Sequence, residues 1–347
     1  MNELDMFADA ARAVLAGQCT PQVVRAIEAG GRPAPEAGAL WAQLEATGLA
    51  DALLDEAAGG AGLGLAQVFG VLEQCGAHAL PLPLAETMVA RALLAQSGVP
   101  RPPGPVALAS GQLRSDGTLH SAIARNARMA DAVLVQAGTA CRLLPVAGAQ
   151  QAAQARQEDA ALAWSRDEVQ AAPSVALPAG LEMRILQAAI VAAQMAGAMG
   201  SVFQRTLQYA NERQQFGRPI GKFQAIQHQL AVMSEQVFAA RMAAQLGCTC
   251  EGWQADRLRV ATAKARCSEA ALAVAETAHA IHGAIGFTAE YDLQLFTRRL
   301  HAWRQTAGGE AYWQRVAGEA LLQHQGMTLD LVRRITDVAT GDTHAAA

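Results

Sequence analysis

The sequence predicts a mainly helical protein in which a small β layer separates two helical blocks. Alanine supplies much of the 52% hydrophobic fraction of the 347-residue chain, and alanine has the highest helix propensity. Residues that favour strands are concentrated in a few short segments. From Gly180 onward, long helical patterns follow one another with short glycine-containing breaks, which is typical of an antiparallel bundle. The length suggests two or three domains or layers.

Residues 1–104 form the first expected block, in which helical patterns alternate with short breaks. Thr20 and Pro21 indicate the start of one helix. A glycine-rich run at residues 59–64 could suggest a dinucleotide loop. However, Gln67 stands where the third glycine would be and no strand pattern precedes the run, so we reject a Rossmann fingerprint. We interpret the run as a helix connection. Further helices are expected over residues 36–48, 66–78 and 84–97.

Residues 105–178 form the expected β layer, which follows a proline-rich boundary at residues 100–105. Short apolar runs separated by Gly, Asp and Asn favour short strands. Residues 150–170 are polar and alanine-rich and predict poorly. The expected strands lie at residues 105–110, 118–124, 131–137 and 141–147.

Residues 179–347 form the third block, a helical bundle with a frayed tail at residues 341–347. The apolar run 186–203 is the one membrane-span candidate, but it contains two glutamines and continues into a polar helix, so we expect a buried helix and no membrane insertion. The acidic, amphipathic amino terminus is no secretory signal. Helices are expected at roughly 182–212, 222–247, 253–282, 290–304 and 309–326.

The charge and the cysteines exclude some classes of function. A formal net charge of −4 without a basic stripe argues against nucleic-acid binding. The six cysteines are scattered, and Cys248 and Cys250 form only a C-x-C without a histidine at zinc spacing. We therefore expect no metal site, and reduced thiols in a cytoplasmic protein.

An unusual group of donors lies at the helix break near residue 216. Arg213 offers a planar bidentate fork for phosphate, and Gln215 and Gln224 add neutral donors. The amides that open the following helix favour an anion, and Phe216 could cover an apolar ring. From the residues alone, Arg213 could equally be a surface ion-pair partner of Glu212.

A second group follows at residues 279–290, HAIHGAIGFTAE. The helix stops abruptly at two glycines, Gly283 and Gly286, which allow close backbone approach to a ligand. Thr288 follows the turn. His282 could bind a ligand or could equally be a core or capping histidine.

Together these segments resemble a known family. RQQFGRPIGKFQAIQ and IHGAIGFTAEYDLQLFTRR are similar to the carboxy-terminal motifs of acyl-CoA dehydrogenases, approximately ER-x-QFG-x-PI-x-x-FQ and Q-x-HGG-x-GFT-x-E. The segment WAQLEATGLADALLDEAAGGAGLGLAQVFGVLEQCG resembles the first domain of that family. The resemblance implies an N-terminal helical domain, a small β domain, here shortened, and a C-terminal four-helix bundle.

The resemblance also implies FAD, bound between the last two domains. In the family, the Arg–Phe segment and the glycine turn contact the adenosine diphosphate half, often across a subunit interface. Two departures weaken the turn: Ala280 replaces a glutamine and Ala284 replaces a glycine. With Gln224 and His282 included, the candidate cofactor-binding residues are Arg213, Gln215, Phe216, Gln224, His282, Gly283, Gly286 and Thr288.

The family reaction removes an α-proton from an acyl-CoA thioester while the flavin accepts the β-hydride. By position, Gly308 stands where the family has its catalytic glutamate, and Glu310 lies two residues later. Glu310 is the candidate base, although it could be a plain helix N-terminal charge. A second family position for the base aligns with Gln187. The T-E-P-x-x-G-S-D-like loop and W-I-T-N-like strand that cradle the flavin ring are missing from the β layer.

These losses resemble the short, degenerate subunit of bacterial heteromeric acyl-CoA dehydrogenases, some of which act on steroid side-chain or dicarboxylate-derived thioesters. The resemblance implies an α2β2 assembly with a longer subunit, an acyl-CoA substrate and electron-transfer flavoprotein as acceptor, in the bacterial cytoplasm. Two alternatives stay open: a self-sufficient homo-oligomer that uses Glu310, and a non-catalytic scaffold that binds no flavin.

Overall fold

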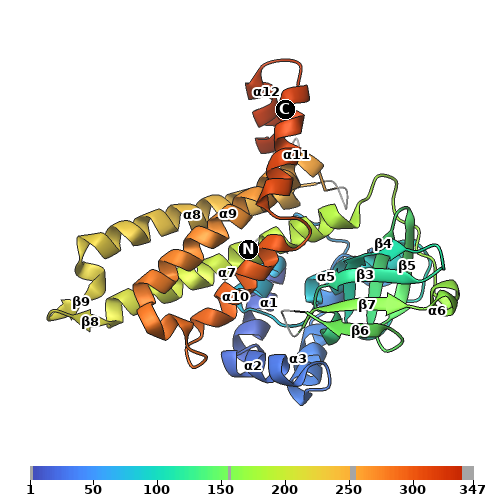
Figure 1. Ribbon diagram of the computed structural model, residues 1–347, viewed down its shortest axis with the longest axis horizontal. Helices are drawn as coiled ribbons and strands as arrows, with labels where there is room; N and C mark the ends of the chain where they lie inside the picture. The colour runs from blue at the N-terminus through green and yellow to red at the C-terminus, as the bar shows by residue number, and fades with distance from the viewer. Residues whose placement is uncertain (1–2, 155–157, 251–254, 338–347) are drawn as a thin grey trace, which may run out of the picture.

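The computed structural model describes residues 3–154, 158–250 and 255–337. The expected mainly α architecture is confirmed. A long helical bundle occupies one side of the molecule, the β layer lies at its other end, and the N-terminal helices lie beneath their junction (Figure 1). The tail at residues 341–347, expected to fray, lies outside the described residues.

The N-terminal block is helical, and its loops follow from local sequence. Thr20 caps α2, because its hydroxyl accepts a hydrogen bond from the amide of Val23 at 3.4 Å. The glycine-rich run is a loop before α4, as expected. A Cβ on Gly60 would lie 2.3 Å from the carbonyl oxygen of Leu54, so the chain passes too closely there for any other residue. The elements are α1 (Glu3–Gln18), α2 (Pro21–Gly30), α3 (Pro35–Ala46), η1 (Leu49–Asp51), η2 (Glu56–Ala58), α4 (Phe69–Ala77) and α5 (Leu84–Gln96).

The β layer contains two small sheets, in the orders β1-β4-β5 and β2-β3-β7-β6. Strand β1 pairs with β4 in parallel, whereas the other ladders are antiparallel. A separate apolar core lies within this layer and includes Val133, Leu162 and Trp164. The elements are β1 (Val106–Ser110), β2 (Gln112–Leu113), β3 (Leu119–Ala124), η3 (Ala127–Met129), β4 (Ala132–Ala137), β5 (Ala140–Pro145), β6 (Gln150–Ala153), β7 (Ala160–Trp164) and α6 (Arg166–Ala171).

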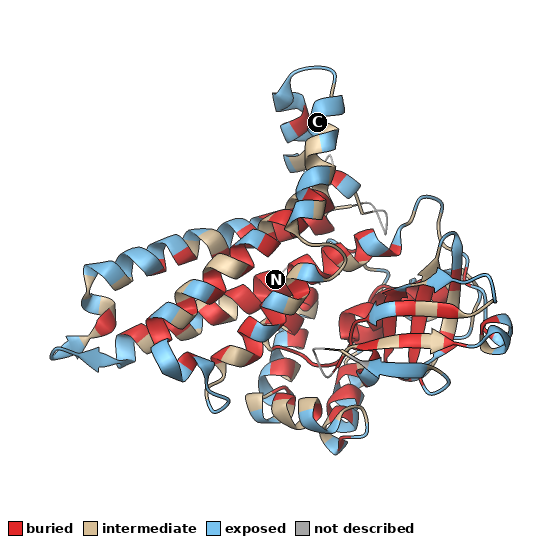
Figure 2. Ribbon diagram, viewed as in Figure 1, coloured by how far each residue is buried: buried red, intermediate tan, exposed pale blue. Residues whose placement is uncertain are grey.

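The third block is a bundle built around α7, whose first two thirds are almost wholly buried (Figure 2). This is the one described helix long and apolar enough to cross a membrane, and 83% of its apolar window is buried inside the protein. The elements are α7 (Met183–Glu212), β8 (Gln214–Gln215), β9 (Arg218–Pro219), η4 (Ile220–Lys222), α8 (Gln224–Cys248), α9 (Arg257–His282), η5 (Gly283–Phe287), α10 (Leu293–Gln305), α11 (Glu310–Gln323) and α12 (Thr328–Thr336).

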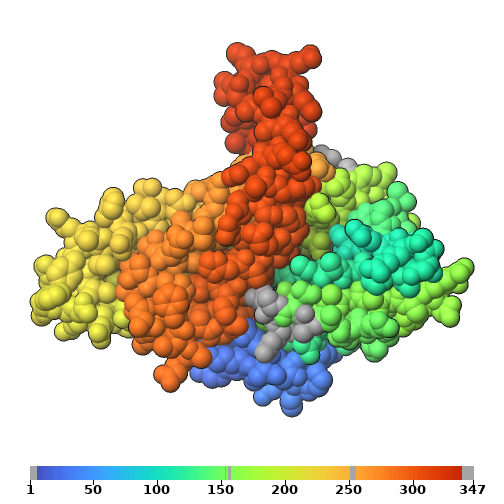
Figure 3. Space-filling view, viewed as in Figure 1, coloured from blue at the N-terminus to red at the C-terminus, as the bar shows by residue number. Residues whose placement is uncertain are grey.

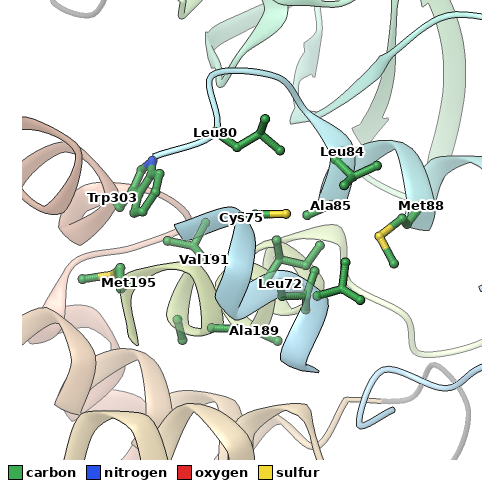
Figure 4. Close-up of a cluster of buried hydrophobic side chains, with 14 of the residues drawn as sticks. Leu72, Cys75, Leu80, Leu84, Ala85, Met88, Ala189, Val191, Met195 and Trp303 are labelled. Atoms are coloured by element: carbon green, nitrogen blue, oxygen red, sulfur yellow. The ribbon is translucent and has the colours of Figure 1, made fainter. Parts of the chain in front are cut away.

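A continuous core joins the N-terminal block to the bundle. Figure 4 shows side chains of α4 and α5 facing the middle of α7, with Trp303 of α10 beside them. The helices cross very closely, since a Cβ on Gly197 of α7 would lie 1.9 Å from the carbonyl oxygen of Glu73 in α4. The start of α11 packs against this body through the buried Trp313, and the carboxy-terminal part of the chain, with α12, projects from it (Figure 3).

Candidate functional site

A short hairpin, β8–β9, projects from the end of the bundle that lies farthest from the β layer (Figure 1). Its two turn residues, Phe216 and Gly217, both have positive φ, at 52° and 78°. A positive φ is unfavourable for a bulky residue, and the Phe216 side chain is 91% exposed. Strain combined with an exposed aromatic ring points to a contact surface rather than to local packing.

The donors expected around this hairpin are all exposed. Arg213 follows the last residue of α7, and Gln224 is the first residue of α8. Among the described residues, the side chains of Arg213 and Gln215 have no hydrogen-bond or ion-pair partner. The carboxylate of Glu212 instead accepts a hydrogen bond from Gln208 at 2.7 Å, so the pairing of Arg213 with Glu212 is not observed.

The glycine turn lies at the same end of the bundle. The Tyr209 ring stacks on the His282 ring with 4.4 Å between centroids, and its hydroxyl donates to the His282 carbonyl oxygen at 3.3 Å. A small apolar cluster that includes Ile220 and Ile281 fills the space beneath. The structure therefore brings the two sequence motifs together, at the start of the hairpin and at the end of α9.

His282 has an unsatisfied nitrogen. The residue is 4% exposed, and its Nδ1 lies 2.8 Å from the Ala278 carbonyl oxygen. Its Nε2 is buried without a hydrogen-bond partner among the described residues. Burial lowers the pKa of His282, which favours the neutral ring. With Nδ1 donating to the carbonyl, Nε2 is left as an acceptor that is enclosed by its neighbours.

The turn itself, η5, leaves its backbone accessible. Gly283 has a φ of 66°, and no atom lies within 4 Å of a Cβ built on it. Gly286 is packed against His282, whose Cβ would be 3.0 Å from an added Cβ. The Thr288 hydroxyl donates to the Ile285 carbonyl oxygen at 2.9 Å, so it stabilises the turn. Phe287 is exposed and stacks on His279 at 4.1 Å.

A second candidate region is a cavity of about 530 Å³ between the β layer and the bundle. Gly308 and Gln187, the two positions at which the resemblance leads us to expect the base, both line this cavity. Gln187 is a poor proton acceptor, and its amide nitrogen donates to the Leu108 carbonyl oxygen at 2.8 Å. The cavity wall therefore has no base at either position.

Glu310 is not among the residues that line this cavity. It is the first residue of α11, and its Oε2 accepts a hydrogen bond from Arg304 Nε at 3.1 Å. This hydrogen bond holds the pKa of Glu310 below its ordinary value. The geometry is that of an ion-paired charge at a helix N-terminus, and a catalytic role for Glu310 stays a prediction.

The sequence analysis missed three charged residues that line the cavity: Arg125, Asp159 and Arg184. They come from the β layer and from the first turn of α7, and only the fold brings them together. It also missed Lys264, which is fully buried beside the Gly308 turn. The available signal was that Lys264 shares a helical face with the small or apolar residues Val260, Cys267 and Ala271. Among the described residues, no cluster suited to a metal ion is present, and the six cysteines are free thiols.

Known proteins are similar to this chain in sequence and in architecture. Residues 186–322 match the acyl-CoA dehydrogenase C-terminal domain, and residues 1–100 match the acyl-CoA dehydrogenase N-terminal domain. Acyl-CoA dehydrogenase IpdE2 of Mycobacterium tuberculosis is 29% identical over 307 residues, which cover 87% of this chain and 92% of that protein.

Two solved structures are similar over nearly the whole chain. The "Tcur3481-Tcur3483 steroid ACAD" variant has a TM-score of 0.79 and 27% identity, covering 92% of this chain and 98% of that one. The ChsE4-ChsE5 complex from Mycobacterium tuberculosis has a TM-score of 0.81, covering 94% and 99%. At 22% identity, the second similarity shows the fold alone.

Proposed function

Since the chain belongs to the acyl-CoA dehydrogenase family, we propose that it serves FAD-dependent α,β-dehydrogenation of an acyl-CoA thioester as the short subunit of a heteromeric enzyme. The observation that carries this proposal is the split between what the chain keeps and what it lacks. The hairpin is exposed at one end of the bundle, and the glycine turn beside it keeps Gly283 and Gly286 although Ala280 and Ala284 depart from the family pattern. The cavity at the other end has Gly308 and Gln187 where a base is needed.

The distance between these ends supports a flavin site that is shared between subunits. Gln187 and Arg213 lie at opposite ends of α7, about 39 Å apart at the helical rise of 1.5 Å per residue. A dinucleotide is too short to reach from the hairpin to the cavity of the same chain. The hairpin therefore serves a flavin whose ring lies in another subunit, and that subunit supplies the base.

FAD is the cofactor of this reaction, and the residues at the hairpin end fit its adenosine diphosphate half. Arg213 would pair with the pyrophosphate, and Gln215 and Gln224 would donate to it. The open backbone at Gly283 admits close approach. The exposed ring of Phe216 would lie against the adenine. When bound, FAD supplies the hydride acceptor.

Within the cavity, Asp159 is the one carboxylate among the lining residues. Its Oδ1 accepts a hydrogen bond from the amide of Asn126 at 2.9 Å, which fixes the carboxylate at the turn before η3. This engagement favours a structural role for Asp159 over proton abstraction. The proposed reaction therefore uses a glutamate from the longer subunit.

Two similar structures suggest which substrate class and which kind of partner to test. Because one similar structure is described as a steroid ACAD, a steroid-derived acyl group is the first substrate class to test. Another similar structure is a complex of two chains, ChsE4 and ChsE5, which supports an unlike partner. Electron-transfer flavoprotein is the acceptor that we propose, and the bacterial cytoplasm is the proposed location.

The test compares the chain alone with the chain co-expressed with a longer acyl-CoA dehydrogenase subunit. We expect flavin absorbance at 450 nm and ferricenium-coupled activity only in the complex, at roughly one flavin per pair of unlike subunits. Yellow, active protein from this chain alone would refute the heteromeric proposal. A complex that stays colourless would favour the scaffold alternative.

Two hairpin variants sharpen this test. Arg213→Gln should lower the flavin content of the complex at least tenfold, about 1.4 kcal/mol of binding free energy. Arg218→Gln is the matched control, because it removes one guanidinium from the same hairpin. Arg218 lies over the Phe223 ring at 4.3 Å and should leave flavin content unchanged. Equal losses in both variants would mean that hairpin charge, rather than Arg213, governs binding.

The homo-oligomeric alternative rests on Glu310, which lies two residues from the cavity-lining Gly308. Glu310→Gln removes the carboxylate and keeps the side-chain shape. We expect the complex with Glu310→Gln to turn over at close to the wild-type rate. A loss of turnover by a factor of 10² or more would identify Glu310 as the base.

A further inference from the structure

Tyr209 lies between the hairpin and the glycine turn and contacts both. It belongs to the last turn of α7, and its carbonyl oxygen accepts a hydrogen bond from the amide of Arg213 at 2.8 Å. Its hydroxyl donates to the carbonyl oxygen of His282, one residue before Gly283, at 3.3 Å. One residue therefore holds both the backbone at the start of the hairpin and the backbone at the start of the turn.

The Tyr209 ring also packs on the two aromatic rings that flank the glycine turn. It stacks on the His282 ring at an interplanar angle of 24°. Tyr291, which follows the turn, lies edge-on to Tyr209 with 6.2 Å between centroids, and its centroid is 5.2 Å from that of His282. Aromatic pairs in these arrangements attract one another beyond the area that they bury. The cluster therefore fixes the end of α7 against the end of α9.

The far side of the turn is held separately. Arg25 of α2 donates to the carbonyl oxygen of Ala289 at 3.2 Å and to Asp292 Oδ1 at 2.8 Å. On the near side, Gly283 has a positive φ and no atom within 4 Å of a Cβ built on it. Glycine has more conformational freedom than other residues, so the contacts of Tyr209 just before Gly283 decide how the turn lies relative to the hairpin.

The hydroxyl of Tyr209 has no second hydrogen to offer a ligand. A phenol carries one donor, and that donor is already used by the His282 carbonyl oxygen. Tyr209 is also half-buried, whereas Arg213 and Gln215 are exposed. Its contribution is therefore to place other groups.

We propose that Tyr209 is a positioning residue, which keeps Arg213 and the glycine turn at the spacing at which both contact the same FAD. The inference rests on the proposed function, because it takes both motifs to serve one flavin. Removing the hydroxyl leaves each motif intact and lets the two move relative to each other. Binding sites lose affinity when their groups are not held in place by supporting contacts. The flavin ring lies in the longer subunit, so its chemistry is unaffected.

The test titrates FAD into the flavin-free complex of this chain with a longer acyl-CoA dehydrogenase subunit and follows flavin fluorescence. We expect Tyr209→Phe to raise the Kd for FAD about three- to tenfold, the size of one neutral hydrogen bond. The kcat at saturating FAD should stay within about twofold of the wild type. Tyr291→Phe is the matched control, because the Tyr291 hydroxyl makes no hydrogen bond within the described residues. An unchanged Kd for Tyr209→Phe, or an equal rise for Tyr291→Phe, would overturn the proposal.

A double-mutant cycle separates positioning from a general structural role. If Tyr209 acts through Arg213, Tyr209→Phe should change the Kd for FAD by less than about twofold when Arg213→Gln is already present. Independent, multiplicative effects of the two substitutions would mean that Tyr209 only stabilises the fold.

Hydrogen–deuterium exchange of the chain alone examines the bridge without flavin or partner. Exchange over residues 283–288 should be faster in Tyr209→Phe than in the wild type or in Tyr291→Phe. Equal exchange in all three proteins would show that the hydroxyl does not hold the turn. Failure of this inference differs from failure of the proposed function: a wild-type complex that binds no FAD refutes both, whereas a complex that binds FAD equally with and without the hydroxyl refutes this inference alone.

Discussion

The buried lysine beside the cavity allows a quantitative prediction about pH and stability. The Lys264 ammonium donates to Ser268 Oγ at 3.0 Å, to the Arg304 carbonyl oxygen at 2.8 Å and to the Gly308 carbonyl oxygen at 3.0 Å. It thereby holds the turn between α10 and α11, in which Ala307 and Gly308 have φ values of 58° and 111°. The side chain is 0% exposed, and burial lowers its pKa from 10.5 to about 7.

The sign of the pH effect follows from proton binding. Between pH 7 and 10.5, Lys264 is mostly neutral in the folded protein and still protonated in the unfolded chain. Because the unfolded state then binds more protons, the free energy of unfolding rises with pH. The slope approaches about 1.4 kcal/mol per pH unit for one proton. This contribution is complete above pH 10.5 and is lost as pH falls towards 7.

Urea unfolding of the wild type and Lys264→Met at pH 7.5 and 9.0 measures this slope. We expect the stability of the wild type relative to the variant to increase by about 1.5–2 kcal/mol over that interval. Buried thiols such as Cys75, whose pKa is raised by burial, affect both proteins alike and cancel in the difference. Lys222 is the only other lysine in the sequence, and it is exposed, so Lys222→Met is the matched control.

Parallel pH profiles for the wild type and Lys264→Met would refute this reasoning. That result would mean that the three acceptors, one for each ammonium hydrogen, keep Lys264 protonated despite burial. A profile of Lys222→Met that diverged from that of the wild type would show that the slope does not report burial.

Two further predictions concern the helix crossing and the hairpin. Gly197→Ala should destabilise the protein by about 1–3 kcal/mol, because the added Cβ would lie 1.9 Å from the Glu73 carbonyl oxygen. Thermal unfolding of both variants measures the difference. Gly200→Ala, on the same helix with no atom within 4 Å of its Cβ, is the control and should stabilise the protein by about 0.5–1 kcal/mol. Equal effects of the two substitutions would contradict the crossing geometry. Phe216→Gly should leave the melting temperature unchanged or raise it, since it relieves a positive φ, while the flavin content of the complex falls. Unchanged flavin content would exclude the ring from the cofactor contact.

The sequence predicted the bundle better than the β layer, because alanine favours helices but conceals the alternating pattern of a strand. Four bundle helices, at 183–212, 224–248, 257–282 and 293–305, lie within four residues of the expected ranges, because their patterns are long and end at glycines or prolines. Strands β6 and β7 were missed. β7, with the sequence AALAW, alternates buried and half-buried positions, but alanine at both kinds of position conceals the alternation from a hydrophobicity pattern.

The predictability of the two candidate sites differs for a related reason. The hairpin and glycine turn are contiguous motifs, so their residues could be identified before the structure, and the fold adds only that they meet through Tyr209 and His282. Helix α12 was missed because the last expected helix ended at residue 326 and none was expected beyond it, whereas α12 spans Thr328–Thr336. The cavity wall combines residues from β3, α7 and the turn before α11. The resemblance identified Gln187 and Gly308, but the other lining residues are not unusual in their own segments, so no local pattern could predict the rest of the wall.

The hairpin and the junction of the β layer with the bundle each contain a residue whose conformation or burial lowers the stability of the isolated chain. Phe216 combines an unfavourable φ with an exposed ring, and Arg125 keeps two nitrogens without hydrogen-bond partners among the described residues. Strained residues and unpaired buried donors each cost about 1–3 kcal/mol, against a total stability of about 5–15 kcal/mol. A ligand that binds only the folded chain increases the free energy of unfolding by mass action and so offsets these costs. The chain should therefore gain stability when its hairpin engages the flavin of a partner.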